Sequence, residues 1–186
     1  MVVQLALTVT FFLFCLGVIY GAICDVRTFV IPNRVPYGLA GLFAVFAALV
    51  WLATPAMPHM GFYLPPILQN VTCGFAVFAF FFVFWRLGWV GGGDVKFVAA
   101  ISLWTGPEYV GVFVILLAVI SVLYVMLLKT LQMWNPYYQA GNWPTFVKKM
   151  LLKMEESAIP YGLPTAIAAL IVMPGIMANA YSLASR

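Results

Sequence analysis

Two long apolar runs of this chain are separated by the stretch Gly91-Gly92-Gly93-Asp94-Val95-Lys96. The run before it, from Ile67 to Leu87, is rich in phenylalanine, and the run after it begins at Val95. About 20 mostly apolar residues are enough for a helix to cross a membrane. The stretch therefore predicts a polar junction between membrane segments, with one acidic side chain at the boundary.

The whole chain has the composition of a membrane protein. It has 186 residues, of which 65% are hydrophobic and 8% are charged, and its mean hydropathy is +1.07. Soluble domains carry about a quarter charged residues, so a soluble globular protein is excluded. The basic residues stand mostly singly at the ends of apolar runs, which argues against a nucleic-acid partner. We therefore predict an all-α polytopic membrane protein in which residues 1–186 form a single membrane-embedded domain, with no soluble domain.

The apolar runs predict about six transmembrane helices. We expect the first run to stay in the membrane as a span, because Ile23 is too bulky to precede Cys24 in a lipoprotein cleavage site and no basic region precedes the run. The fourth run is only about half a span long, so we expect it to be short or partly embedded. The six runs are Met1–Cys24, Tyr37–Ala53, Ile67–Leu87, Val95–Thr105, Glu108–Leu128 and Pro160–Ala180.

The basic residues favour one side of the predicted bundle. Eight of the nine Lys and Arg residues lie in alternate loops, and only Arg186 lies on the other side. The loop from Thr54 to Pro66 and the break at Gly106-Pro107 carry no basic residue. The positive-inside rule therefore places the basic loops in the cytoplasm and both termini outside. Asp25 and Asp94 are then expected on the same, cytoplasmic side at similar depth.

The longest polar stretch, Trp134 to Ser157, allows two interpretations. Apolar side chains recur in it at helical spacing, opposite Lys148, Lys149 and Lys153. This pattern is typical of an amphipathic helix on the inner leaflet, and a solvated basic loop fits it equally well. In either case we expect residues 134–157 to form a cytoplasmic loop.

Asp25 and Asp94 are the only aspartates of the chain, and each lies at the end of an apolar run. An ionisable group in such a position is expensive and usually functional, although acidic residues at helix ends also occur as simple interfacial groups. Two neighbouring carboxylates that share one proton are able to act on a water molecule as general base and general acid, which is the chemistry of peptide hydrolysis. Both residues are therefore predicted to be catalytic if their helices pack side by side.

Three glycines precede the second aspartate. Gly91, Gly92 and Gly93 would let the backbone approach a substrate closely and adopt positive φ, and the N–H groups of Gly92 and Gly93 are candidate oxyanion donors. A flexible loop between spans is the alternative interpretation. The run Pro160-Tyr161-Gly162-Leu163-Pro164 opens the last segment on the same side, where it either completes the wall of a cleft or is an ordinary helix start.

No metal site and no cofactor are expected. Cys15, Cys24 and Cys73 form no Cys-x-x-Cys pair, and His59, the single histidine, lies in a loop on the side opposite to both aspartates. The three cysteines are expected to pack as small hydrophobic residues.

Taken together, these motifs resemble a known family. Gly91-x-Gly93-Asp94 followed by Val95-Lys96, with Asp25 before Ile31-Pro32-Asn33 and with the late Pro160-Tyr161-Gly162, is similar to the type IV prepilin peptidases in order and spacing over essentially the whole chain. The resemblance implies an aspartic endopeptidase of the bacterial inner membrane that cuts the basic leader from prepilins or pseudopilins at the cytoplasmic face. It also implies that Asp25 and Asp94 are catalytic and that the partners are these substrates and membrane lipids.

The chain departs from the larger family members in one respect. It lacks their inserted Cys-x-x-Cys zinc ligands, because Asp25 directly follows the first run. It is similar instead to the short, protease-only members associated with Flp-type tight-adherence pili, so methylation of the new N-terminus is not expected. Two alternatives stay open. One is a presenilin-like intramembrane protease, whose usual Pro-Ala-Leu motif is absent here, and the other is a small cation transporter or channel, which would need more polar pore-lining residues.

Overall fold

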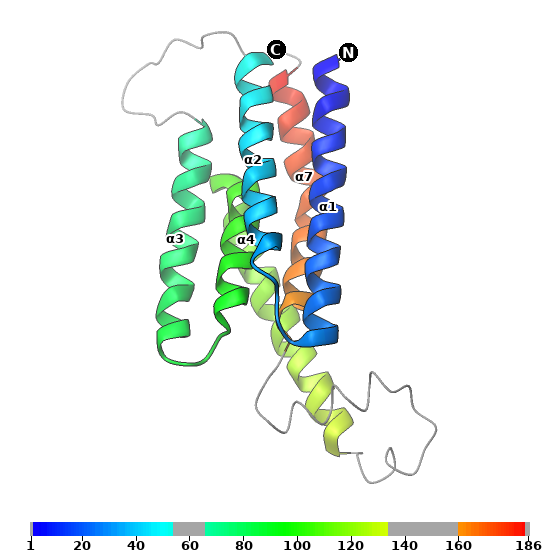
Figure 1. Ribbon diagram of the computed structural model, residues 1–186, viewed down its shortest axis with the longest axis vertical. Coiled ribbons are helices and arrows are strands. Elements are labelled where there is room, and N and C mark those ends of the chain that lie inside the picture. The colour runs from blue at the N-terminus through cyan, green and yellow to red at the C-terminus, as the bar shows by residue number, and fades with distance from the viewer. Residues whose placement is uncertain (1, 54–65, 134–159, 185–186) are drawn as a thin grey trace.

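The chain folds into a bundle of long helices (Figure 1). The computed structural model describes residues 2–53, 66–133 and 160–184, and within them every regular element is an α-helix. These helices are α1 (Val2–Thr28), α2 (Arg34–Ala53), α3 (Pro66–Arg86), α4 (Gly92–Met133) and α7 (Gly162–Ala184). All five helices of this described part are long and apolar enough to cross a membrane. The predicted all-α polytopic membrane fold is therefore confirmed.

The outer surface of the bundle is apolar. Phe12, Phe75 and Ile115 are exposed over 63%, 70% and 65% of their surface, and many other large apolar side chains are similarly exposed. In water a continuous surface of this kind would drive aggregation, whereas lipid tails cover it at no cost. The helices are accordingly apolar on all sides, as membrane spans are.

Helix α4 is a hairpin of two helical halves. At Gly106 the backbone leaves the helical conformation, with φ 58° and ψ −176°, and Pro107 follows. Figure 1 shows α4 rising from its junction with α3, turning back partway up the bundle and descending past the lower end of α1. The first half, up to Thr105, is about 21 Å long at 1.5 Å per residue, which is shorter than the hydrocarbon layer. The predicted segments Val95–Thr105 and Glu108–Leu128 are these two halves.

The turn inside the bundle needs its own hydrogen-bond partners. Pro107 has no N–H group, so it leaves unpaired the Leu103 carbonyl that an ordinary residue at its position would bond. The side-chain amide of Asn70 on α3 donates to this carbonyl over 3.0 Å. A Cβ atom on Gly106 would lie 2.6 Å from the Asn70 Oδ1 atom, and Gly106 also has positive φ. Backbone groups at membrane depth must be satisfied within the protein, and Asn70 meets this requirement.

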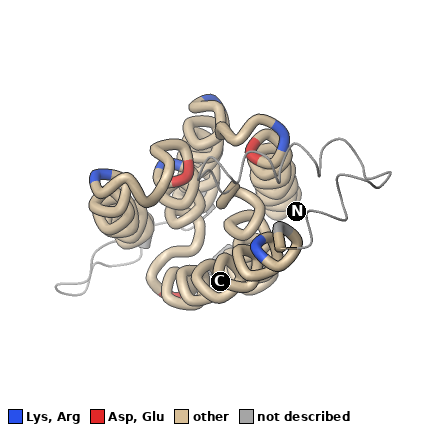
Figure 2. The backbone as a smooth tube through the Cα atoms, turned by 90° about the horizontal axis from the view of Figure 1, so that it is seen from below, with Lys and Arg blue, Asp and Glu red and all other residues tan. Residues whose placement is uncertain are grey.

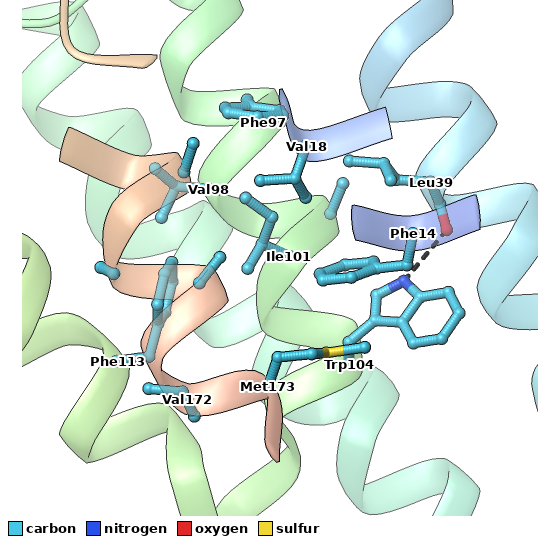
Figure 3. Packing of buried hydrophobic residues seen from close by; sticks show 14 of the residues in the cluster. Phe14, Val18, Leu39, Phe97, Val98, Ile101, Trp104, Phe113, Val172 and Met173 are labelled. Carbon is cyan, nitrogen blue, oxygen red and sulfur yellow. Dashed lines mark hydrogen bonds between the residues drawn. The ribbon is translucent and has the colours of Figure 1, made fainter. Parts of the chain in front are cut away.

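The core of the bundle is centred on Trp104, which is 1% exposed and lies on the first half of α4. Its ring contacts Phe14 of α1 at a centroid distance of 4.6 Å and Phe46 of α2 at 5.3 Å. Its indole N–H donates to the Leu39 carbonyl of α2 over 3.1 Å (Figure 3). These contacts join three helices at one side chain, so the position of α4 relative to α1 and α2 is fixed by a packed aromatic group.

The predicted order of the helices is found, whereas the helix ends differ from those predicted. Figure 1 shows the start of α1 and the end of α7 at one end of the bundle, as an even number of passes requires. Helix α1 continues through Asp25 to Thr28, so this aspartate lies within the last turns of the helix and not after it. Helix α2 begins earlier than predicted, at Arg34. The predicted amphipathic segment within residues 134–157 lies outside the described residues.

We expect Trp104→Ala to lower the free energy of unfolding in detergent by about 3 kcal/mol. This is the lower end of the range for buried aromatic residues, because lipid-like surroundings remove the transfer term and leave the cavity term. Trp51→Ala is the matched control, since Trp51 is 63% exposed and its loss is expected to change stability by no more than about 0.5 kcal/mol. Equal destabilisation by the two variants, measured by thermal unfolding, would contradict the central position of Trp104.

Candidate functional site

Asp25 is buried near the lower end of α1. Its side chain is only 3% exposed, although it is surrounded mainly by apolar helices. The backbone N–H of Gly162, the first residue of α7, donates to its Oδ2 atom over 2.6 Å. A backbone N–H is free to do this because the first four N–H groups of a helix have no partner within the helix. The first and last helices of the bundle are thus joined directly at this carboxylate.

The chain leaves α1 just after this point. Phe29 has φ 59°, a left-handed conformation that is unusual for a bulky residue, and its N–H donates to the Asp25 carbonyl over 2.7 Å. This is a left-handed helix end at a position where glycine is the common choice. Backbone strain of this kind occurs often beside functional sites. The left-handed conformation of Phe29 turns the chain sharply from α1 into residues 30–33.

Asp94 lies in the first turn of α4, three residues after Gly91. The N–H of Val95 donates to the Gly91 carbonyl over 3.2 Å, so Gly91 occupies the N-cap position. The Asp94 carboxylate reaches back to the Gly91 N–H, which is the side-chain half of a capping box. The other oxygen, Oδ1, is buried and has no hydrogen-bond partner within the described part of the chain.

The two carboxylates are brought together at the lower end of the bundle. Asp25 and Asp94 lie within electrostatic range of each other, although α1 and the start of α4 are far apart in the sequence. Figure 1 shows the lower ends of α1, α4 and α7 together at the end opposite to the chain termini. Three helices therefore supply one acidic centre.

The glycines before Asp94 behave as predicted in one respect and not in the other. None of Gly91, Gly92 and Gly93 has positive φ, so that part of the prediction is wrong. Close approach is found instead: a Cβ atom on Gly93 would lie 3.3 Å from the Ile31 carbonyl oxygen, and one on Gly91 would lie 2.7 Å from Asp94 Oδ2. The glycines serve to bring backbone next to backbone and next to a carboxylate.

Gly162 and Tyr161 are site residues whose contacts the sequence did not reveal. A Cβ atom on Gly162 would lie 2.8 Å from both Cβ and Oδ2 of Asp25. Burial raises the pKa of the Tyr161 phenol, and the negative charge of Asp94 raises it further, so this side chain lies close to the second carboxylate and stays protonated at neutral pH. The only indication in the sequence was the Pro160-Tyr161-Gly162 run. It predicted that this segment lies on the same side as the aspartates, but not that its residues contact them.

A polar contact fixes the segment between α1 and α2 against α4. Lys96 donates from Nζ to Oδ1 of Asn33 over 2.9 Å, and its ammonium lies 5.9 Å from the centre of the Tyr37 ring. Lys96 therefore interacts with the segment leading into α2. This contact and the approach of Gly93 to Ile31 hold the segment after Asp25 against the first turn of α4, which carries Asp94.

The arrangement has the parts needed to activate a water molecule. One carboxylate oxygen is held by a backbone N–H, a second is buried without a partner, and the N–H groups of the first turn of α4 lie beside them. Two carboxylates that interact electrostatically are able to share a proton, which would let one act as a base and the other as an acid. Among residues 2–53, 66–133 and 160–184, no three His, Cys, Asp or Glu side chains gather as metal ligands would.

Comparison with known proteins gives one match. The profile described as the type IV leader peptidase family matches residues 12–127. This range is more than half of the chain and includes both aspartates, and it ends before α7. Comparison with curated proteins and with solved structures gives no match.

We expect Gly162→Ala to destabilise the protein by about 1–3 kcal/mol, the usual range for overpacking a tight contact. The backbone of Gly162 is not left-handed, and the atoms nearest to an added methyl group all belong to Asp25. Gly111→Ala is the control, because no atom lies within 4 Å of the added Cβ and removal of a mid-helix glycine stabilises by about 0.5–1 kcal/mol. Thermal unfolding measures both, and a stabilised Gly162→Ala variant would show that the contact is not tight.

Proposed function

Because the chain belongs to the type IV leader peptidase family, and is thus a multi-pass membrane peptidase for prepilin-type substrates, we propose that Asp25 and Asp94 are its catalytic pair. The observation that carries the proposal is the convergence of the only two aspartates at one end of the bundle, within electrostatic range of each other. In an apolar bundle two neighbouring carboxylates are costly, and they persist where a reaction needs them. The family assignment favours this peptidase over a cation transporter.

In the proposed reaction the pair shares one proton and binds the attacking water. The ionised carboxylate takes a proton from the water molecule. At the same time the oxygen of that water forms a bond to the carbonyl carbon of the scissile peptide. The protonated carboxyl then donates to the leaving amide nitrogen as the carbon–nitrogen bond breaks. The unpartnered Oδ1 atom of Asp94 supplies a free acceptor for that water, while the Gly162 N–H keeps the Asp25 carboxylate in one orientation.

The start of α4 is the proposed oxyanion site. The N–H groups of Gly92 and Gly93 belong to the first turn, where no helical carbonyl accepts them. They carry the positive end of the helix dipole and lie within two residues of Asp94. Such preorganised donors stabilise the charge that develops on the carbonyl oxygen in the transition state. Gly91 has a different role in this scheme, because its N–H is directed to the Asp94 carboxylate.

The active end is proposed to face the cytoplasm. Arg27, Arg34, Arg86 and Lys96 all lie at or next to the ends of helices there. The sequence from Thr54 to Pro66, between the other ends of α2 and α3, has no basic residue. The positive-inside rule assigns the basic end to the cytoplasm of a bacterial inner membrane. In a substrate with a short basic leader followed by an apolar helix, the peptide bond between the two parts would then lie at the same membrane depth as the two carboxylates. Flp-type prepilins are the proposed substrates.

The decisive experiment is leader cleavage with an Flp-type prepilin co-expressed with the wild type, Asp25→Asn or Asp94→Asn. Each variant is expected to lose at least about 100-fold in cleavage rate, because each removes a group that transfers a proton. Glu108→Gln is the matched control: Glu108 lies at the α4 turn, where it accepts a hydrogen bond from Asn179 that glutamine is also able to accept. Normal processing by either aspartate variant would refute the pair. Failure of the wild type on several pilins would refute only the substrate.

Gly162→Ala is expected to lower kcat more than it raises KM. The added methyl group displaces the Asp25 carboxylate, which acts on the transition state and contributes little to holding the substrate. Gly111→Ala again serves as control. Assays are made well below the unfolding temperature of the less stable variant, so that loss of folded protein does not mimic loss of rate. An increase in KM alone would instead assign Gly162 to substrate binding.

A further inference from the structure

A second site lies between α1 and α2, where a groove opens along the two helices. It has a volume of about 310 Å³ and is lined by Leu13, Gly17 and Tyr20 of α1 and by Arg34, Gly38 and Leu42 of α2. The groove exists because Gly38 has no side chain, and no atom lies within 4 Å of the place its Cβ would occupy. It follows α2 from Arg34 to Leu42, a length of about 12 Å. None of its lining residues belongs to the aspartate site.

The mouth of the groove carries a positive charge. Arg34, the first residue of α2, donates from one Nη to the Tyr20 hydroxyl over 2.7 Å, and its guanidinium lies 5.8 Å from the centre of the Tyr20 ring. This bond uses one of the five N–H donors of an arginine, so the fork still offers donors to an anion. Figure 2 shows basic positions distributed around the lower end of the bundle, which is the end where α2 begins.

The size of the groove limits the kind of molecule that is able to bind in it. One turn of a helix about 10 Å wide occupies about 420 Å³. The groove, at about 310 Å³, therefore holds less than one turn and cannot seat a membrane-spanning helix. A single hydrocarbon chain fits both the volume and the mainly apolar lining. A chain that enters from the basic end would carry its polar headgroup next to Arg34, and arginine binds phosphate through two parallel N–H bonds.

We propose that the groove binds one anionic phospholipid, with an acyl chain along Gly38 and the leucines that line the groove and with the phosphate on Arg34. The site does not depend on the proposed peptidase chemistry, since it shares no residue with the aspartate site. Zwitterionic phospholipids also carry a phosphate, but the arginine repels the positively charged group of their headgroup. The site is therefore expected to prefer a lipid whose headgroup has a net negative charge.

Native mass spectrometry of the purified protein in detergent tests this, with equal amounts of phosphatidylglycerol and phosphatidylcholine added. The wild type is expected to retain one phosphatidylglycerol with about fivefold preference. Arg34→Gln is expected to lose the preference, and Gly38→Leu is expected to retain neither lipid because its side chain fills the groove.

Gly41→Leu is the matched control and is expected to match the wild type. Gly41 lies one turn further along α2, also has open space around its Cβ, and does not line the groove. Equal lipid retention by the Gly38→Leu and Gly41→Leu variants, with both still folded by thermal unfolding, overturns the site. If Gly38→Leu alone changes prepilin cleavage or oligomeric state while lipid retention is unchanged, the groove belongs to a protein partner and the lipid proposal is again wrong.

Discussion

A carboxylate buried among apolar helices needs hydrogen-bond donors, and in a membrane bundle the backbone supplies unpaired N–H groups only where helices begin. Both aspartates of this protein meet that condition. Asp25 accepts from Gly162, the first residue of α7, and Asp94 reaches the N–H of Gly91 at the cap of its own helix. The positive ends of two helix dipoles therefore point at the same acidic centre. The location of the site at one end of the bundle, and not at its middle, follows from this constraint.

The hairpin form of α4 is what brings the second of these helix starts into place. A straight helix of 42 residues would be about 63 Å long, roughly twice the thickness of the hydrocarbon layer. The turn at Gly106 and Pro107 folds it back inside the bundle, and Asn70 replaces the hydrogen bond that proline cannot make. The short first half then packs against α1 and α2 through Trp104. Its N-terminus, with Asp94, is held at the depth of Asp25 because the same half-helix is anchored ten residues further along.

Sequence patterns predict those parts of this structure that depend on composition along the chain. Apolar run lengths gave the membrane segments, and the alternation of basic loops placed both aspartates at one end, because each follows a run that ends on the basic side. The contacts that complete the site could not be read in this way. Every residue has a backbone N–H, so nothing marks the Gly162 N–H as the partner of a carboxylate 137 positions earlier. Asn70 is likewise an ordinary polar residue until the missing N–H of Pro107 gives its amide a role.

The glycines show most clearly that a sequence motif does not by itself reveal how its residues act in the structure. The Gly-x-Gly-Asp pattern suggests unusual backbone angles, yet positive φ among the described glycines occurs at Gly88 and Gly106 and not in the triplet. What the triplet provides is the absence of a side chain: Gly93 lies against the Ile31 backbone. Gly162 does the same for Asp25, without belonging to that motif. Close approach of small residues is the general means of packing helices in lipid, where no hydrophobic force drives them together. In this protein the same property brings backbone donors within reach of two acids, so packing and the proposed chemistry depend on the same missing atoms.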